Sequence, residues 1–226
     1  MKSKKIVKTK IRVAIDSPSA SGAGSISKMI AKHYNLLYCD TGKIYRFLAK
    51  KLIYKNPKNK IKYLKKISKK INLKKLKSKS LLNDEVAYIA SQIAKDLRVR
   101  KLVYNYQRYL AYYPGSKFRG SILDGRDITY RIMPDAHFKF YITANTQTRA
   151  KRRFKELRNL GQNVKFTEIL KGMKKRDRED RTRKHSRLKK TEDSYLINTT
   201  NLSIKSSFQK VKRIMDRKLD KIWKKL

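Results

Sequence analysis

The sequence predicts an α/β fold in which helices flank a central parallel sheet. Five short apolar segments have the composition of buried strands: residues 11–16, 36–39, 121–123, 138–144 and 195–198. Helical stretches, with apolar residues three to four positions apart, separate them. This alternation is typical of parallel sheets with right-handed crossovers. Ligands bind such sheets at the carboxyl ends of the strands, and the polar motifs of this chain fall at those ends.

The first helix follows the strand at 11–16 after a loop rich in Ser and Gly, and we expect Ser25 or Ser27 to cap it. The second begins near Lys43, with Thr41 as its expected cap. Three later helices are predicted to start near Asn145 or Thr146, at Thr167 and at Ser203. The last carries an apolar stripe that includes Phe208, Val211 and Met215.

The stretch between the second and third strands, about residues 55–118, is too long for one crossover. We expect an inserted subdomain there, within a single domain whose core is formed by about residues 10–54 and 119–226. Residues 55–79 contain twelve Lys and no Asp or Glu. Two interpretations stay open for this segment: a solvated pair of basic helices and a nucleic-acid-binding face.

The charge of the whole chain is strongly positive. The sequence has 61 Lys plus Arg and 17 Asp plus Glu, which gives a net charge of +44. Such a protein attracts polyanions, but net charge does not name a ligand. The abundance of Lys, Asn, Ile and Tyr is equally well explained by an A/T-rich genome.

Other features narrow the class of protein. The single cysteine, Cys39, excludes a disulfide within the chain and zinc sites with several Cys ligands. The three histidines lack the spacing of a helical zinc motif. No uncharged run approaches the roughly 18 residues of a membrane helix. We therefore expect a cytoplasmic protein without membrane contact.

Residues 17–25, of sequence SPSASGAGS, lie where a phosphate-binding loop belongs, between the first strand and the first helix. Backbone amides and a helix N-terminus can hold phosphate oxygens there, and Ser25 could bind Mg²⁺. The match to the G-x-x-x-x-G-K-[ST] motif is incomplete, because Ser17 and Ala23 replace its first Gly and its Lys. A structural turn of small residues is the alternative interpretation.

Three more motifs place charge near strand ends. Arg46 follows the second strand within DTGKIYR, and its guanidinium suits a bidentate phosphate contact. The third strand runs into LDGRD, which carries Asp124, Arg126 and Asp127 and would be costly to bury without a ligand. The Arg-rich segment KKRDREDRTR, residues 174–183, has the composition of a mobile phosphate-binding lid, which we place at about residues 172–190.

In this order, the segments IDSPSASGAGS, DTGKIYR, ASQIAKDLRVR, LDGRDI, RDREDRTR and TTNLSI resemble the cytidylate kinases. The resemblance covers nearly the whole chain. It implies a P-loop kinase fold, an inserted nucleotide-binding subdomain and a lid. The implied activity is phosphorylation of CMP and dCMP by ATP, with Mg²⁺ as cofactor, in pyrimidine metabolism.

The resemblance also implies residue roles. Asp124, Arg126, Arg176 and Arg183 would act in catalysis, and Ser25 would hold Mg²⁺. The ATP phosphates would bind Ser17, Pro18, Ser19, Ala20, Ser21, Gly22, Ala23, Gly24 and Ser25. The nucleotide acceptor would bind Thr41, Arg46, Ser91, Arg100, Arg126, Asp127, Arg176, Asp180 and Arg183, with Ser91, Arg100 and Asp127 reading the cytosine.

Departures from the pattern leave a second class of function open. Ala23 removes the phosphate-binding Lys, and residues 129–131 also differ from the family pattern. Lys28 or Arg131 could supply the missing charge. The leading hypothesis is a monomeric ATP-dependent (d)CMP kinase. The alternative is a catalytically weak nucleotide-binding relative that acts as a basic nucleic-acid-binding protein.

Overall fold

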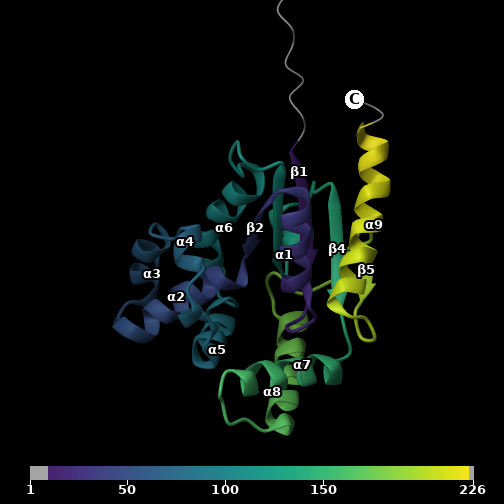
Figure 1. Ribbon diagram of the computed structural model, residues 1–226. Coiled ribbons are helices and arrows are strands. Elements are labelled where there is room, and N and C mark those ends of the chain that lie inside the picture. The colour runs from purple at the N-terminus through teal and green to yellow at the C-terminus, as the bar shows by residue number, and fades with distance from the viewer. Residues whose placement is uncertain (1–9, 224–226) are drawn as a thin grey trace, which may run out of the picture.

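A computed structural model describes residues 10–223 and shows a five-stranded parallel sheet (Figure 1). The strand order is β2-β3-β1-β4-β5. Each neighbouring pair is parallel, and Ile11 of β1 lies opposite Gly120 of β3. The predicted fold class and all five predicted strands are confirmed. The strands are β1 (Ile11–Asp16), β2 (Leu36–Asp40), β3 (Gly120–Gly125), β4 (Phe138–Thr143) and β5 (Tyr195–Asn198).

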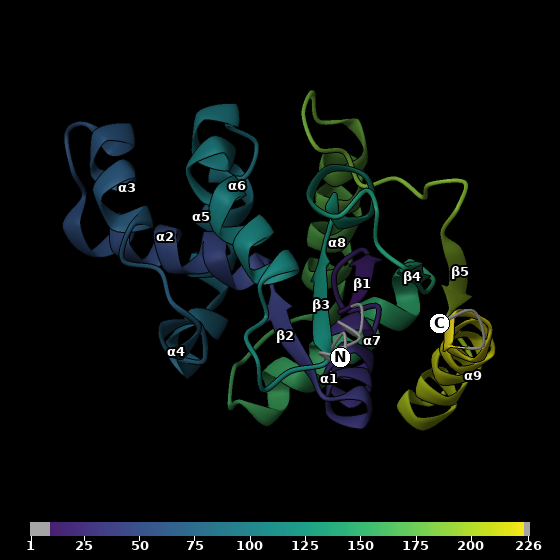
Figure 2. The ribbon, with the colours of Figure 1, turned by 90° about the horizontal axis from the view of Figure 1, so that it is seen from above.

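Helices cover both faces of the sheet (Figure 2). Because side chains alternate along a strand, Val13 and Ile15 of β1 face one core and Ala14 faces the other. The first core includes residues of α1 (Ala23–Tyr34) and α9 (Ile204–Trp223), and the second includes residues of α2 (Gly42–Lys55) and α6 (Leu97–Tyr112). The predicted stripe of Phe208, Val211 and Met215 is buried in the first core.

The segment between α2 and β3 forms a helical group beside the β2 edge of the sheet (Figure 1). It shares the core of the sheet, since Leu64, Ile67 and Leu81 belong to the same apolar cluster as Ala14. The twelve lysines of residues 55–79 are all exposed. This helical group consists of α6 and four elements that precede it: α3 (Lys60–Ser68), α4 (Leu73–Leu76), the 3₁₀-helix η1 (Lys79–Leu82) and α5 (Asp84–Ile93).

Two further helices lie beyond the carboxyl ends of the strands: α7 (Thr146–Asn159) and α8 (Phe166–Thr182) (Figure 1). The predicted start of α7 is confirmed, because the Asn145 side chain accepts a hydrogen bond from the Thr148 amide. A short π-helical turn, η2 (Ile128–Ile132), follows β3. None of the helices in residues 10–223 is long and apolar enough to cross a membrane.

The predicted cap position of α2 is confirmed at Thr41, but the side-chain capping bonds predicted for α1 and α2 do not form. Helix α1 begins at Ala23, two residues before Ser25, and its N-cap is Gly22 in the left-handed region. Thr41 is the N-cap of α2, but its hydroxyl donates to the carbonyl of Asp124 at 2.7 Å instead of capping the helix. In both cases the loop geometry at the strand ends overrides the local capping preference.

Candidate active site

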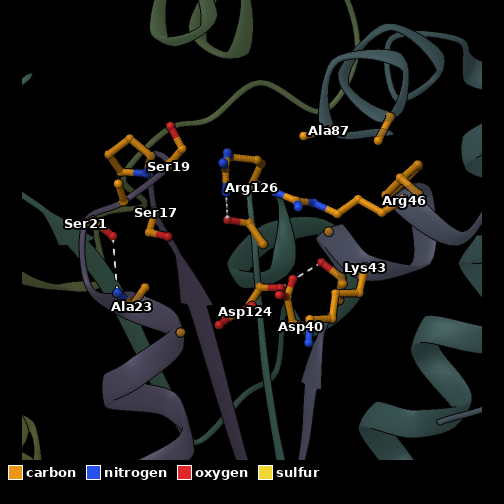
Figure 3. A pocket seen from close by; sticks show the side chains of 18 of the residues that line it. Ser17, Ser19, Ser21, Ala23, Asp40, Lys43, Arg46, Ala87, Asp124 and Arg126 are labelled. Atoms are coloured by element: carbon orange, nitrogen blue, oxygen red, sulfur yellow. Dashed lines mark hydrogen bonds between the residues drawn. The ribbon is translucent and has the colours of Figure 1, made fainter. Parts of the chain in front are cut away.

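One cavity of about 450 Å³ opens at the carboxyl ends of β1, β2 and β3 (Figure 3). In Figure 3 the loop from Ser17 to Ala23 lies on one side, Arg46 and Ala87 lie on the other, and Arg126 projects between them. The cavity is lined by every residue predicted for the site: Ser17, Pro18, Ser19, Ala20, Ser21, Gly22, Ala23, Gly24, Ser25, Thr41, Arg46, Ser91, Arg100, Asp124, Arg126, Asp127, Arg176, Asp180 and Arg183.

The loop of residues 17–25 has the backbone of an anion-binding turn. Ala20 and Gly22 are left-handed, with φ of 57° and 88°. Alternation of left- and right-handed residues points successive N–H groups into one concavity. A side chain at Gly22 would be strained by this φ of 88°, and its Cβ would lie 3.3 Å from Ile204 Cδ1. The loop is held to the third strand by the Ser17 amide, which donates to the Gly125 carbonyl at 3.1 Å.

An acidic pair lies beside this loop. Asp40 and Asp124 are opposite one another at the ends of β2 and β3. The Tyr38 hydroxyl donates to Asp124 Oδ2 at 2.9 Å. Burial, reinforced by the charge of Asp40, raises the pKa of Asp124 to about 8. A cation placed here would stabilise the carboxylate.

Gly24, in the first turn of α1, lets this acidic pair approach the phosphate loop. A Cβ built on Gly24 would lie 3.7 Å from Asp124 Oδ2, so the carboxylate faces the loop directly. Ser25 is exposed at the same turn. Mg²⁺ is usually bound by one or two protein oxygens together with substrate phosphates. Ser25 and Asp124 therefore fit a magnesium ion carried by a nucleotide.

A cluster of arginines surrounds Asp180. Arg126 Nε donates to one carboxylate oxygen at 2.8 Å, and Arg183 Nη1 donates to the other at 3.2 Å. Burial alone would raise the pKa of Asp180, yet the guanidinium groups around it outweigh burial and lower the pKa. The cluster contains more positive than negative charge, which suits a phosphate group.

Arg176 is the arginine of this cluster with unused hydrogen-bonding capacity. Its Nε atom is buried and has no hydrogen-bond partner within the described part of the chain. Burial and the nearby charge of Arg126 lower its pKa to about 10. Buried donors without an acceptor are costly, so an anion in the cavity would relieve this cost.

The opposite wall holds a buried ion pair. Arg100 Nη2 donates to Asp127 Oδ2, and both side chains are about 5% exposed. Arg100 Nη1 also donates to the Ala94 carbonyl at 3.0 Å. Ser91 lies on the same wall and donates to the Tyr88 carbonyl at 2.7 Å. These groups form a polar, planar surface in an otherwise apolar part of the cavity that includes Ala87, Ala90 and Ala94.

Arg46 projects from α2 toward this wall and donates to the Leu81 carbonyl at 2.9 Å. This contact joins the helical group after α2 to the cavity. Of the two cations considered as replacements for the loop Lys, Lys28 lines the cavity and Arg131 does not. Lys43 also lines it and received no role in the sequence analysis.

Asp16 supports the site without lining the cavity, and the sequence analysis assigned it no role. It is fully buried and accepts from the amides of Ile128 and Thr129 at 2.8 and 3.0 Å and from the Thr129 hydroxyl at 2.6 Å. Burial raises its pKa to about 6. Asp16 thereby fixes the turn that follows Arg126 and Asp127. An acidic residue ending an apolar strand was the available signal.

Arg149 is the second supporting residue that the sequence did not reveal. It forms a bidentate pair with Asp177 of α8, and its side chain is 1% exposed. It also donates to the Ala144 carbonyl at 2.8 Å and to the Ser19 carbonyl at 3.3 Å. One guanidinium therefore joins helix α8, the end of β4 and the loop of residues 17–25.

Known proteins resemble this chain in sequence. The sequence profile of the family described as cytidylate kinase matches residues 13–217. Similar curated proteins named cytidylate kinase include one from Bartonella tribocorum, 41% identical over 201 residues that cover 87% of this chain and 90% of the relative. Another, from Sinorhizobium medicae, is 38% identical over an aligned region that covers 92% of this chain and 97% of the relative.

A solved structure shows the same fold. The crystal structure of an uncharacterized protein from Eubacterium ventriosum superposes with a TM-score of 0.52 at 17% identity, covering 92% of this chain and 99% of the other. The profile match extends over the strands, the phosphate loop and the Arg-rich helix that form the cavity. The chain belongs to the cytidylate kinase family.

Proposed function

We propose that this protein transfers the γ-phosphate of ATP to CMP and dCMP, giving ADP and CDP or dCDP. The observation that carries the proposal is the single cavity that joins a phosphate loop, an arginine cluster and the buried Arg100–Asp127 pair. Cytidylate kinase relatives at 36–41% identity support the same activity. We also propose that it acts as a monomer in the cytoplasm.

On the donor side, residues 17–25 would hold the ATP phosphates with their backbone amides. Ser25 and Asp124 are proposed to hold Mg²⁺, Ser25 directly and Asp124 through water. When bound, this ion would neutralise charge on the phosphates that react. The raised pKa of Asp124 supports this assignment, since the site favours either a proton or a cation beside that carboxylate.

On the acceptor side, Arg46 and Arg126 would bind the CMP phosphate beside Thr41. Asp127, Arg100 and Ser91 would contact the cytosine edge. Cytosine presents an amino donor where uracil has a carbonyl, so a carboxylate accepts from the first and repels the second. Arg176 and Asp180 are proposed to meet the sugar, and Arg183 to contact phosphate.

The transfer itself is a displacement at phosphorus. An oxygen of the CMP phosphate forms a bond to the γ-phosphorus while the bond from that phosphorus to the bridging oxygen of ADP breaks. Protein groups contribute by aligning the two nucleotides and neutralising charge. The arginine cluster around Asp180 supports such a role, because its residues line the cavity and Arg126 projects between the loop and Arg46.

The test is ADP formation from ATP and Mg²⁺ in the presence of CMP, dCMP, UMP or AMP. We expect saturable turnover with CMP and dCMP, at least about 10²-fold above UMP in kcat/KM, because a buried hydrogen-bonding site rejects the wrong pattern strongly. Asp127→Asn should reduce that preference. Equal rates with UMP and CMP would contradict the assignment of Asp127. No turnover, together with salt-sensitive RNA binding, would favour the nucleic-acid-binding alternative.

A further inference from the structure

The phosphate loop of this chain has no cation of its own. Residues 17–25 contain neither Lys nor Arg, and Ala23 occupies the place where the loop motif has Lys. Ala23 is buried as the first residue of α1. A nucleotide held by this loop would bring several negative charges to it. The neutralising charge therefore has to come from another element that lines the cavity.

Most cations of the cavity already have partners on its other walls. Arg100 pairs with Asp127, and Arg126 and Arg183 pair with Asp180. Arg46 contacts the Leu81 carbonyl. These groups surround the proposed acceptor. Arg176 belongs to the same arginine cluster, with Arg126 and Asp180 beside it. Lys28 and Lys43 lie outside that cluster, and neither has a hydrogen bond or ion pair with another residue of the described chain.

Lys28 belongs to the helix whose N-terminus forms the phosphate loop. It follows Gly24 by one turn, and helical side chains lean toward the N-terminus of their helix. Gly24 has no side chain to block that path, and Lys28 is exposed, so its ammonium can move toward a bound phosphate. We propose that Lys28 replaces the missing loop lysine and binds the β- and γ-phosphates of ATP. This inference rests on the proposed kinase function.

Lys43 is the competing candidate, but its surroundings differ. It lies in the first turn of α2, and Figure 3 places it beside Asp40. Its charge acts on the Cys39 thiol together with those of Asp40 and Asp124. Lys43 thus faces the acidic pair, while Lys28 lies on the loop helix itself.

The activity test compares Lys28→Ala with Lys32→Ala. Lys32 is an exposed lysine one turn further along α1 and outside the cavity, so it gives the same change in charge. We expect Lys28→Ala to lower kcat about 10²-fold, the effect of removing one group that binds transition-state charge, with the KM for CMP within about twofold. Adding Ala23→Lys to Lys28→Ala should restore most of the rate. Lys32→Ala should match the parent.

A binding test needs no turnover. The affinities of ATP and AMP are measured by calorimetry for the parent, Lys28→Ala and Lys43→Ala, with thermal unfolding as the check on folding. Lys28→Ala should weaken ATP about tenfold or more and leave AMP unchanged. Parent-like ATP affinity and rate in Lys28→Ala, or the loss appearing in Lys43→Ala instead, would overturn the proposal. If the parent phosphorylates no CMP but Lys28→Ala still weakens ATP selectively, the kinase function fails and the role of Lys28 stands.

Discussion

Helix α8 carries two buried aspartates three residues apart, and their surroundings differ sharply. Asp177 meets one arginine, Arg149, in a bidentate pair away from the cavity. Asp180 lines the cavity and contacts two arginines, with Arg176 close by. One arginine balances the negative charge of Asp177, whereas the positive charge of the arginines around Asp180 exceeds the negative charge of that carboxylate. The comparison indicates that the first region anchors the helix and the second is built for a further anion.

The largest effect is expected at the anchor. Arg149→Ala leaves the Asp177 carboxylate buried without its partner, and removing one member of a buried pair typically costs about 3–5 kcal/mol. The Tm should fall by roughly 10 °C at about 2–4 °C per kcal/mol. Chemical denaturation measures the free energy of unfolding. Arg149→Ala with Asp177→Ala should recover part of the loss, and no recovery would contradict the pairwise account.

Arg126→Ala, at the cavity, should lower activity strongly and stability little. Removing this guanidinium takes one partner from Asp180, but Arg183 and Arg176 stay beside that carboxylate and charge repulsion with Arg176 falls. The Tm should therefore stay within about 3 °C of the parent. The kcat/KM for CMP should fall about 10²-fold, because one phosphate-binding group is lost. Steady-state kinetics measures the expected loss of kcat/KM, and thermal unfolding measures the Tm. A loss of stability as large as that of Arg149→Ala would remove the distinction between the regions.

A smaller loss is expected at Asp16, which supports the site without lining it. Asp16→Ala leaves two amides and one hydroxyl without their acceptor, and an unsatisfied buried group costs about 1–3 kcal/mol. Removal of the buried carboxyl, whose pKa is raised by burial, offsets part of this loss, so urea unfolding should show a net decrease of about 1–3 kcal/mol. Hydrogen exchange should show faster exchange at Ile128 and Thr129. Unchanged exchange at those amides would mean that Asp16 does not hold the turn.

The last effect concerns Asp124 and appears only when the pH is varied. Folding raises the pKa of this carboxyl from 3.8 to about 8, so the folded protein holds the proton more tightly than the unfolded chain. Its contribution to stability is therefore full below about pH 4 and is lost as the pH rises toward 8. Asp124→Asn should raise the Tm relative to the parent at pH 8.5 and change it little at pH 4.5. A constant difference across this range would contradict the raised pKa.

The sequence predicted the sheet because each strand is a short apolar run that ends at polar residues. It also predicted the part of the cavity lining that follows the strands, because parallel strands present their carboxyl ends on one edge. The lining residues away from the strand ends, such as Ser91, Arg100 and Arg176, were predicted from the resemblance to the cytidylate kinases. Local capping rules failed at Ser25 and Thr41, where loop backbone and a cross-strand carbonyl determine the geometry.

The supporting contacts were out of reach for a different reason. Arg149 and Asp177 lie in helices rich in charge, where the sequence pattern is the same for a solvated residue and a buried one. Only the packing of α7 against α8 brings them together. Lys43 was missed although Thr41 and Arg46 of the same motif were predicted to bind the nucleotide, because one lysine in so basic a chain gives no signal of its own.

The most direct test of the account measures Asp177→Asn and Asp180→Asn side by side, with the Tm and the KM and kcat for CMP as readouts. The account predicts that Asp177→Asn loses mainly stability, with a nearly unchanged KM for CMP in the protein that remains folded. It predicts that Asp180→Asn keeps most of its stability and loses about 10²-fold in kcat/KM. The same profile for both variants would contradict the division of α8 into an anchor and a binding surface.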